Sequence, residues 1–169
     1  SALAMYLSSI NKSCCVYPEC SPKTIQRDHN VTRLAGRPLQ VNEQQRFDLL
    51  LWWANESPRC IVELKMTYAQ GNSVIRDGEK LVTYSREAKR IGLRSGYLLV
   101  YSHAYRNRER SKAVQGKETL AKRFREYQSG LQKLNPGFQF VGEKIPAKPY
   151  ATDEVRDYYD GAALYRISF

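Results

Sequence analysis

Residues 60–66 read CIVELKM, which places two charged side chains, Glu63 and Lys65, inside an otherwise apolar run. Residues two apart in a β-strand point to the same face of the sheet. A carboxylate and an ammonium that share a face either neutralise each other or serve chemistry at one point. An exposed ion pair contributes only about 0–1 kcal/mol to stability. Pairing alone therefore does not explain why these charges stand in a strand that is suited to burial.

A third charge, Asp48, lies in the preceding apolar run RFDLLLWWA at 46–54, and the turn-forming sequence NESP at 55–58 joins the two runs. This pattern predicts a β-hairpin. If 55–58 forms the loop, Asp48 lies opposite Lys65, with Glu63 diagonally adjacent on the same face. The opposite face of the hairpin is expected to form core and consists of Leu49, Leu51, Trp53, Val62, Leu64 and Met66.

The flanking segments predict the elements that would hold the hairpin. Before it, 14–22 contains two prolines and indicates a loop, and 23–34 roughly alternates like a strand. After it, Asp77 is a good helix N-cap and Gly92 a good helix stop. The elements expected after the hairpin are a helix over 77–92, a buried strand over 96–102, an amphipathic helix over 117–134 and short strands over 138–145 and 163–169.

Together these elements predict an α/β fold with a mixed central β-sheet flanked by helices. Both faces of the hairpin are largely apolar, which is typical of sheets that are covered on both faces. The length of 169 residues suits one ordinary domain. We expect a single domain over 1–169, with a core over about 23–134 and a C-terminal extension over 135–169.

The order of these features resembles the PD-(D/E)XK nuclease superfamily. The residues that carry the resemblance are Phe47-Asp48 and Glu63-Leu64-Lys65, followed by the helix and the buried strand, so it covers about 46–102. It implies a restriction-endonuclease-like αβββαβ core and a DNA endonuclease that acts in restriction, phage defence or mobile elements. Many members carry a further Glu before the hairpin; the nearest acid here is Glu43, a weak choice for a supporting metal ligand.

The chemistry that the resemblance implies agrees with the residue types. Two carboxylates at one point repel each other and favour a divalent cation, so Asp48 and Glu63 are expected to bind Mg²⁺, with Mn²⁺ able to substitute. Such a metal polarises the scissile phosphate and lowers the pKa of a bound water. Lys65 would orient that water and offset the charge that develops on the phosphorane.

The charge distribution indicates a polyanionic partner. The net charge is +10, and the segment from Arg86 to Lys133 holds 13 basic and 4 acidic residues, a net of +9. Such an asymmetry is typical of nucleic-acid binders, and we expect DNA rather than RNA. The residues expected to contact phosphates are Arg106, Arg108, Arg110, Lys117, Lys122, Arg123 and Arg125. Tyrosines that could stack on bases, or simply occupy amphipathic surface positions, are Tyr101, Tyr105, Tyr127, Tyr158 and Tyr159.

Other classes are less well supported. No apolar run approaches the roughly 18 residues of a membrane span, and we expect a cytoplasmic protein without a membrane partner. The spacing of Cys15 and Cys20 is loose for zinc, and Cys60 is expected to be a small core residue. Two alternatives stay open, a non-catalytic nucleic-acid-binding domain with a nuclease-like fold and a nuclease toxin neutralised by an immunity protein. A homodimer is also left open.

Overall fold

The computed structural model describes residues 14–20, 46–53, 58–67, 72–90, 92–107, 116–146, 148–149, 151–152 and 154–169. The elements are β1 (Cys14–Cys20), β2 (Phe47–Trp53), β3 (Pro58–Thr67), α3 (Asn72–Arg90), β4 (Ser95–Asn107), α4 (Gly116–Leu134), β5 (Phe138–Lys144), β6 (Ala151–Thr152) and β7 (Arg156–Ser168). The strands form one sheet in the order β1-β2-β3-β4-β7-β5, and β6 pairs with β7.

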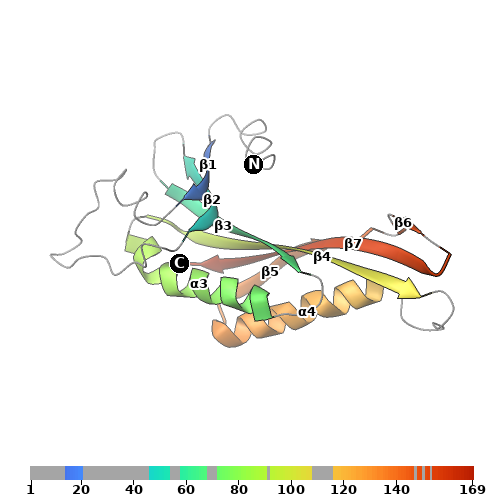
Figure 1. Ribbon diagram of the computed structural model, residues 1–169. Coiled ribbons are helices and arrows are strands. Elements are labelled where there is room, and N and C mark those ends of the chain that lie inside the picture. The colour runs from blue at the N-terminus through green and yellow to red at the C-terminus, as the bar shows by residue number, and fades with distance from the viewer. Residues whose placement is uncertain are drawn as a thin grey trace. The chain divides into compact units, whose positions relative to one another are not determined.

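The sheet is mixed. Neighbours β1, β2 and β3 are antiparallel, whereas β3 and β4 are joined by the crossover helix α3 and point the same way (Figure 1). A parallel pair needs a crossover of this kind, because a tight turn reverses the chain. The predicted α/β class with a mixed sheet flanked by helices is confirmed. The strands after residue 135 belong to this sheet, and β7 lies between β4 and β5.

The contacts divide the chain into two units, one of Ser1–Glu63, Lys80–Tyr97 and Ile167–Phe169, the other of Leu64–Glu79 and Leu98–Arg166. In the first unit, β1 is a strand, although the two prolines of 14–22 had predicted a loop; only Pro18 lies within β1. Among the described strands β1 stands at one end of the order, a position where a proline is tolerated because its missing N–H is not needed by a second neighbour.

The β2–β3 hairpin of the first unit forms as predicted but in a different register. The sequence paired Leu49 with Leu64, whereas the structure pairs Leu49 with Val62. Pro58 belongs to the ladder instead of the loop, and a bulge lies between Leu51 and Trp52. A shift of two residues keeps each side chain on its face. Continued by one residue, the observed register sets Asp48 opposite Glu63, not opposite Lys65.

The charged face of the hairpin is the more deeply buried one. Leu50 and Ile61 are fully buried, and Glu63 is only 3% exposed. The expectation that the opposite face forms core is correct for Leu49 but wrong for Met66, which is 60% exposed. The side chains of α3 that contact the charged face explain this difference, as described below.

Helix α3 begins at Asn72, five residues before the predicted N-cap at Asp77. Its end agrees with the sequence. Gly92 has a positive φ of 84°, its N–H donates to the Lys89 carbonyl, and the N–H of Leu93 donates to the Ala88 carbonyl. This pair of hydrogen bonds is the Schellman motif that terminates many helices at a glycine.

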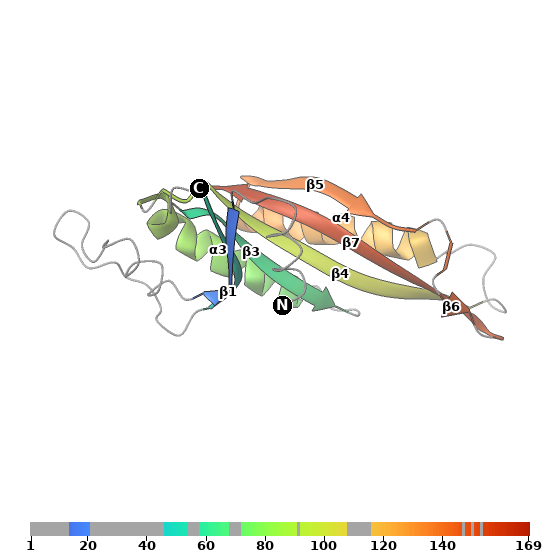
Figure 2. The ribbon, with the colours of Figure 1, turned by 90° about the horizontal axis from the view of Figure 1, so that it is seen from above.

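In the second unit, α4 lies along one side of β4, β7 and β5 (Figures 1 and 2). Its buried residues include Leu120, Phe124, Tyr127 and Leu131, as the helical spacing predicted. The Tyr165 hydroxyl of β7 donates a 2.7 Å hydrogen bond to the Phe124 carbonyl. Strand β7 alternates strictly between buried and less buried residues, so one of its faces packs against the helix side.

Several expectations fall on other parts of the chain or on longer elements than predicted. Strand β4 continues to Asn107, so Arg106 lies in a strand and not in a loop. Glu43, Arg108, Arg110 and the strand expected over 23–34 lie outside the described residues. Cys60 is buried, as expected for a small core residue. No helix in the described part of the chain has the length and apolarity to span a membrane.

Candidate functional site

Glu63 is the most deeply buried charged residue of the hairpin, and a lysine from α3 compensates its charge. The Lys80 Nζ atom lies 2.6 Å from Glu63 Oε1, with side-chain exposures of 19% and 4%. Burying an ionised carboxylate costs several kcal/mol unless a cation and hydrogen bonds satisfy it. Lys80 supplies that cation within the first unit.

The Lys80 ammonium is held by more than the carboxylate. It also donates a hydrogen bond to the Arg46 carbonyl oxygen and lies 4.9 Å from the centroid of the Phe47 ring. Phe47 is fully buried and packs against Tyr84, with ring centroids 4.8 Å apart. An acid, a carbonyl and an aromatic face therefore fix the position of one ammonium group, and the apolar rings keep water from it.

Lys65 is compensated in a similar way within the second unit. Its Nζ atom lies 2.9 Å from Asp77 Oδ2, and both side chains are partly buried. Asp77 and Lys80 are three residues apart in α3, so they lie on neighbouring positions of one helix face. Each charged residue of the strand pattern Glu-x-Lys therefore has an oppositely charged partner in α3. Lys80 pairs with Glu63 in the first unit, and Asp77 pairs with Lys65 in the second unit.

Asp48 is half-buried at the start of β2. The β2–β3 pairs end at Leu49 and Val62, and the same register continued by one residue sets Asp48 opposite Glu63, at neighbouring positions of antiparallel strands. The described residues contain no group of three or more His, Cys, Asp or Glu side chains that could hold a metal. A metal site here would therefore use two carboxylates, with any contribution from Glu43 outside the described residues.

The predicted basic residues separate into two groups. Lys117, Lys122 and Arg125 are exposed on α4, as expected, and Lys122 lies 4.0 Å from Glu126. Arg123 is only partly exposed. Its Nη1 atom donates hydrogen bonds of 2.7 Å to Ser102 Oγ and 2.9 Å to the His103 carbonyl oxygen, so it joins α4 to β4.

The tyrosines also separate. Tyr127 and Tyr159 are buried, Tyr158 is half-buried, and Tyr101 and Tyr105 are exposed. Burial raises the pKa of the Tyr127 hydroxyl above its usual value. The buried pair serves packing, so only the exposed positions are accessible to a ligand.

Neither the ion pair of Lys80 with Glu63 nor that of Asp77 with Lys65 was predicted from the sequence. Asp77 was assigned to a helix cap, and Lys80 was not singled out. The sequence does contain a signal for these pairs. Asp77 and Lys80 have the i,i+3 spacing of one helix face, and the strand residues Glu63 and Lys65 carry the opposite charges. Comparison with known proteins gives no further assignment, because no family model, curated protein or solved structure matches this chain.

Proposed function

We propose that this chain is a metal-dependent nuclease that hydrolyses phosphodiester bonds, with DNA as its substrate. The observation that carries the proposal is the β2–β3 register: continued by one residue beyond the Leu49–Val62 pair, it sets the carboxylates of Asp48 and Glu63 opposite each other in the first unit. The strongly basic segment from Arg86 to Lys133 supports a polyanionic substrate, because it attracts phosphate backbones over a distance.

The residues at the site fit a divalent cation. The Lys80 ammonium stands 2.6 Å from Glu63 Oε1, so a metal at this carboxylate would have to displace that ammonium or share the carboxylate with it. Asp48 and Glu63 would hold Mg²⁺ or Mn²⁺, since Mg²⁺ is commonly bound by one or two carboxylates plus waters and substrate phosphates. When bound, the metal polarises the phosphate and acidifies a bound water.

The chain itself supplies positioning and charge. Asp77 holds the Lys65 ammonium at 2.9 Å, which restricts a long flexible side chain before substrate arrives. An ammonium held near the reacting phosphate stabilises the negative charge that develops in the transition state. Glu63 itself is only 3% exposed, and a low-dielectric environment strengthens the electrostatic interactions of its carboxylate.

A second candidate is a non-catalytic nucleic-acid-binding domain, and a specific observation favours it. Glu63 and Lys65 are each already compensated by an oppositely charged side chain of α3. The hairpin therefore needs neither a metal nor a phosphate to be electrostatically stable. For such a domain, the two ion pairs only hold strand β3 against helix α3, and the basic residues alone bind nucleic acid.

Plasmid nicking separates the two candidates. The purified protein is incubated with supercoiled DNA and Mg²⁺, with and without EDTA, alongside Glu63→Gln, Asp48→Asn and the control Glu79→Gln, an exposed acid of α3. A nuclease gives nicking that EDTA and the two site variants abolish and that the control variant retains. Nicking at the wild-type rate by Glu63→Gln, or no nicking under any metal, contradicts the proposal.

Lys65 has a test of its own. Lys65→Ala should lower the cleavage rate by roughly 10²–10³, since that is the usual cost of losing one electrostatic donor in a transition state. DNA binding in the presence of Ca²⁺ should change little, because the charge acts mainly during reaction. Lys89→Ala, which removes an exposed lysine of helix α3, is the control. Equal rates for both variants would make Lys65 a structural counter-charge only.

A further inference from the structure

One face of the second unit carries a row of aromatic side chains that the proposed cleavage site does not use. In β4, Leu98, Val100, Ser102 and Ala104 are buried, and the alternate residues are more accessible. Tyr101 is 36% exposed, Tyr105 is 55% exposed, and His103 between them is half-buried. Three consecutive outward positions of one strand are therefore planar rings.

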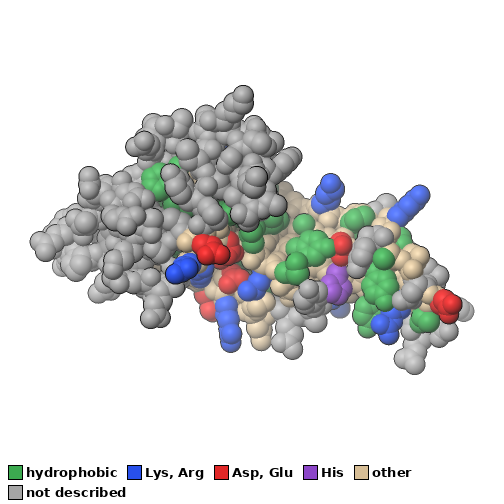
Figure 3. Space-filling view, turned by 45° about the horizontal axis from the view of Figure 1, so that its top comes forward, with side chains coloured by type: hydrophobic (Ala, Val, Ile, Leu, Met, Phe, Trp, Pro, Cys, Tyr) green, Lys and Arg blue, Asp and Glu red, His purple; other side chains and the backbone are tan. Residues whose placement is uncertain are grey.

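This face is opposite to α4. Arg123 reaches from α4 to Ser102, which belongs to the buried set of β4, so the tyrosines point to the other side of the sheet. Figure 3 shows hydrophobic side chains gathered beside a histidine, with basic side chains near them. On the neighbouring strand β3, Met66 adds an apolar side chain that is 60% exposed.

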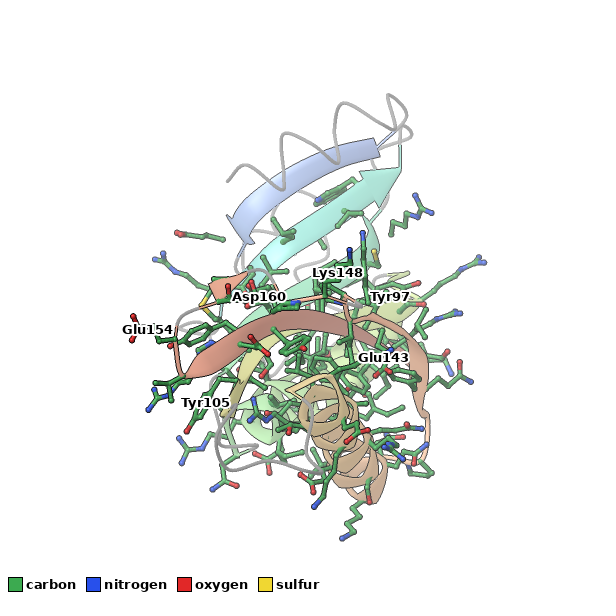
Figure 4. The ribbon with its side chains drawn as sticks, turned by 90° about the vertical axis from the view of Figure 1, so that its right-hand side faces the viewer. Tyr97, Tyr105, Glu143, Lys148, Glu154 and Asp160 are labelled. Atoms are coloured by element: carbon green, nitrogen blue, oxygen red, sulfur yellow. The ribbon has the colours of Figure 1, made fainter. Side chains whose placement is uncertain are left out.

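Arginines accompany the rings. The Arg156 guanidinium of β7 lies 4.9 Å from the centroid of the Tyr105 ring. Directly after the aromatic row, the sequence continues as Arg106-Asn107-Arg108-Glu109-Arg110-Ser111-Lys112, which has four basic residues and one acid. Asp160 also belongs to this face of β7, on the side away from α4 (Figure 4), so among the described residues the attraction of an anion depends on Arg156.

We propose that this face of β4 binds single-stranded nucleic acid by stacking bases on Tyr101, His103 and Tyr105. Alternate residues of a strand are about 7 Å apart, so three such rings offer successive platforms along an extended strand. Sheets that expose aromatic rings bind two or three unstacked bases in this way. Arginine beside the rings adds both a phosphate contact and a further stacking plane.

The proposal commits to an unpaired strand because a duplex cannot offer its base faces. In a duplex the bases are stacked on one another, and only their edges and the backbone are accessible. A row of rings on a sheet is therefore useful to a single strand, a frayed end or a displaced strand. The single-strand binding site does not depend on the proposed nuclease function. Only the further statement that the nuclease cuts unpaired strands rests on that function.

Fluorescence anisotropy with a labelled dT15 oligonucleotide, the rU15 equivalent and a 15-base-pair duplex tests the proposal. EDTA is present throughout, so that cleavage plays no part. Tyr101→Ala and Tyr105→Ala should each weaken single-strand binding by roughly 5- to 150-fold, the effect of losing one stacked base. Tyr105→Phe should bind almost as the wild type does, because it keeps the ring and loses only the hydroxyl. The arms with dT15 and rU15 establish which backbone is preferred.

The matched control is Val141→Ala, which removes an exposed apolar side chain from β5 without removing a ring. Binding that is equal in the wild type and both Tyr→Ala variants overturns the proposal, as does a duplex that loses as much affinity as dT15. A wild-type dimer that Tyr105→Ala converts to a monomer without weakening dT15 binding would identify the face as a subunit interface instead. If the wild-type protein binds dT15 but does not nick plasmid DNA, the proposed nuclease activity is refuted and the proposed single-strand binding site is not.

Discussion

Replacing Lys80 with methionine tests whether the buried charge of Glu63 depends on α3. The variant keeps the volume of the side chain and removes the ammonium that lies 2.6 Å from Glu63 Oε1. Removing one partner of a buried ion pair costs about 3–5 kcal/mol. The Lys80 side chain is 19% exposed, so water screens part of the interaction, and we expect a loss of about 3 kcal/mol. At roughly 2–4 °C per kcal/mol for a protein of this size, Tm should fall by about 6–12 °C.

A double-mutant cycle isolates the pair from other effects. Glu63→Gln should cost less than Lys80→Met, because the lysine keeps the Arg46 carbonyl and the Phe47 ring as partners. The double variant replaces an ion pair by neutral groups of similar size and should lie within about 1 kcal/mol of the wild type. Urea unfolding at pH 7 followed by circular dichroism measures all four proteins, with Lys89→Met as the exposed control. Losses that simply add in the double variant would refute the coupling.

Adding Mg²⁺ to the same proteins connects the pair to the proposed chemistry. If Asp48 and Glu63 bind metal, the Lys80→Met protein should regain stability, by about 2.7 kcal/mol at a metal concentration 100 times its Kd. The Glu63→Gln protein has lost a ligand and should respond less. A Lys80→Met protein whose unfolding midpoint is the same in Mg²⁺ and in EDTA would mean that the two carboxylates do not form a metal site.

Three further predictions concern the packing of the second unit. Arg123→Gln should cost about 2 kcal/mol, since it removes charged hydrogen bonds from α4 to β4, whereas the exposed neighbour Arg125→Gln should change the unfolding free energy by less than about 0.5 kcal/mol. Gly116→Ala should cost about 1–3 kcal/mol in urea unfolding, because its Cβ would lie 2.4 Å from a buried tyrosine ring, while Gly142→Ala meets nothing within 4 Å and should be near neutral. Burial raises the pKa of the Tyr165 hydroxyl above its usual value, so the stability it contributes is complete below about pH 10 and is lost as the pH rises further. Tyr165→Phe should therefore flatten the fall in stability above pH 10, at a cost of about 1 kcal/mol at pH 7 for the lost hydrogen bond.

The regular elements followed from the sequence where periodicity was long and uninterrupted. Helix α4 begins one residue before its predicted start and ends where predicted, because five apolar residues repeat at helical spacing over its length. The hairpin strands were predicted instead from two apolar runs joined by the turn-forming sequence NESP. The face assignment failed, because both faces are largely apolar, and only packing partners decide which one is buried.

Boundaries and register depended on local choices that the sequence left open. Asp77 has the ideal type for an N-cap, yet its carboxylate binds Lys65, and the helix begins earlier at Asn72. Pro58 reads as a turn residue but starts β3, which moves the pairing of the whole hairpin by two residues. Arg123 and Arg125 are two positions apart in one basic segment. Only the structure shows that Arg123 is hydrogen-bonded to β4 and that Arg125 is exposed.

The site shows why a charged pair in a buried strand has two interpretations. A buried carboxylate requires a positive charge close by, and a lysine from a covering helix or a divalent cation each provides one. The sequence near Glu63 displays the acid but not the cation that answers it, because Lys80 comes from a later element. A metal held by Glu63 would compete with the Lys80 ion pair for the same carboxylate. In a nuclease, the Lys80 ammonium must move away from Glu63 or share it when metal and substrate bind. In a non-catalytic binding domain, the Lys80–Glu63 ion pair stays intact. The response of the Lys80→Met protein to Mg²⁺ distinguishes these two states.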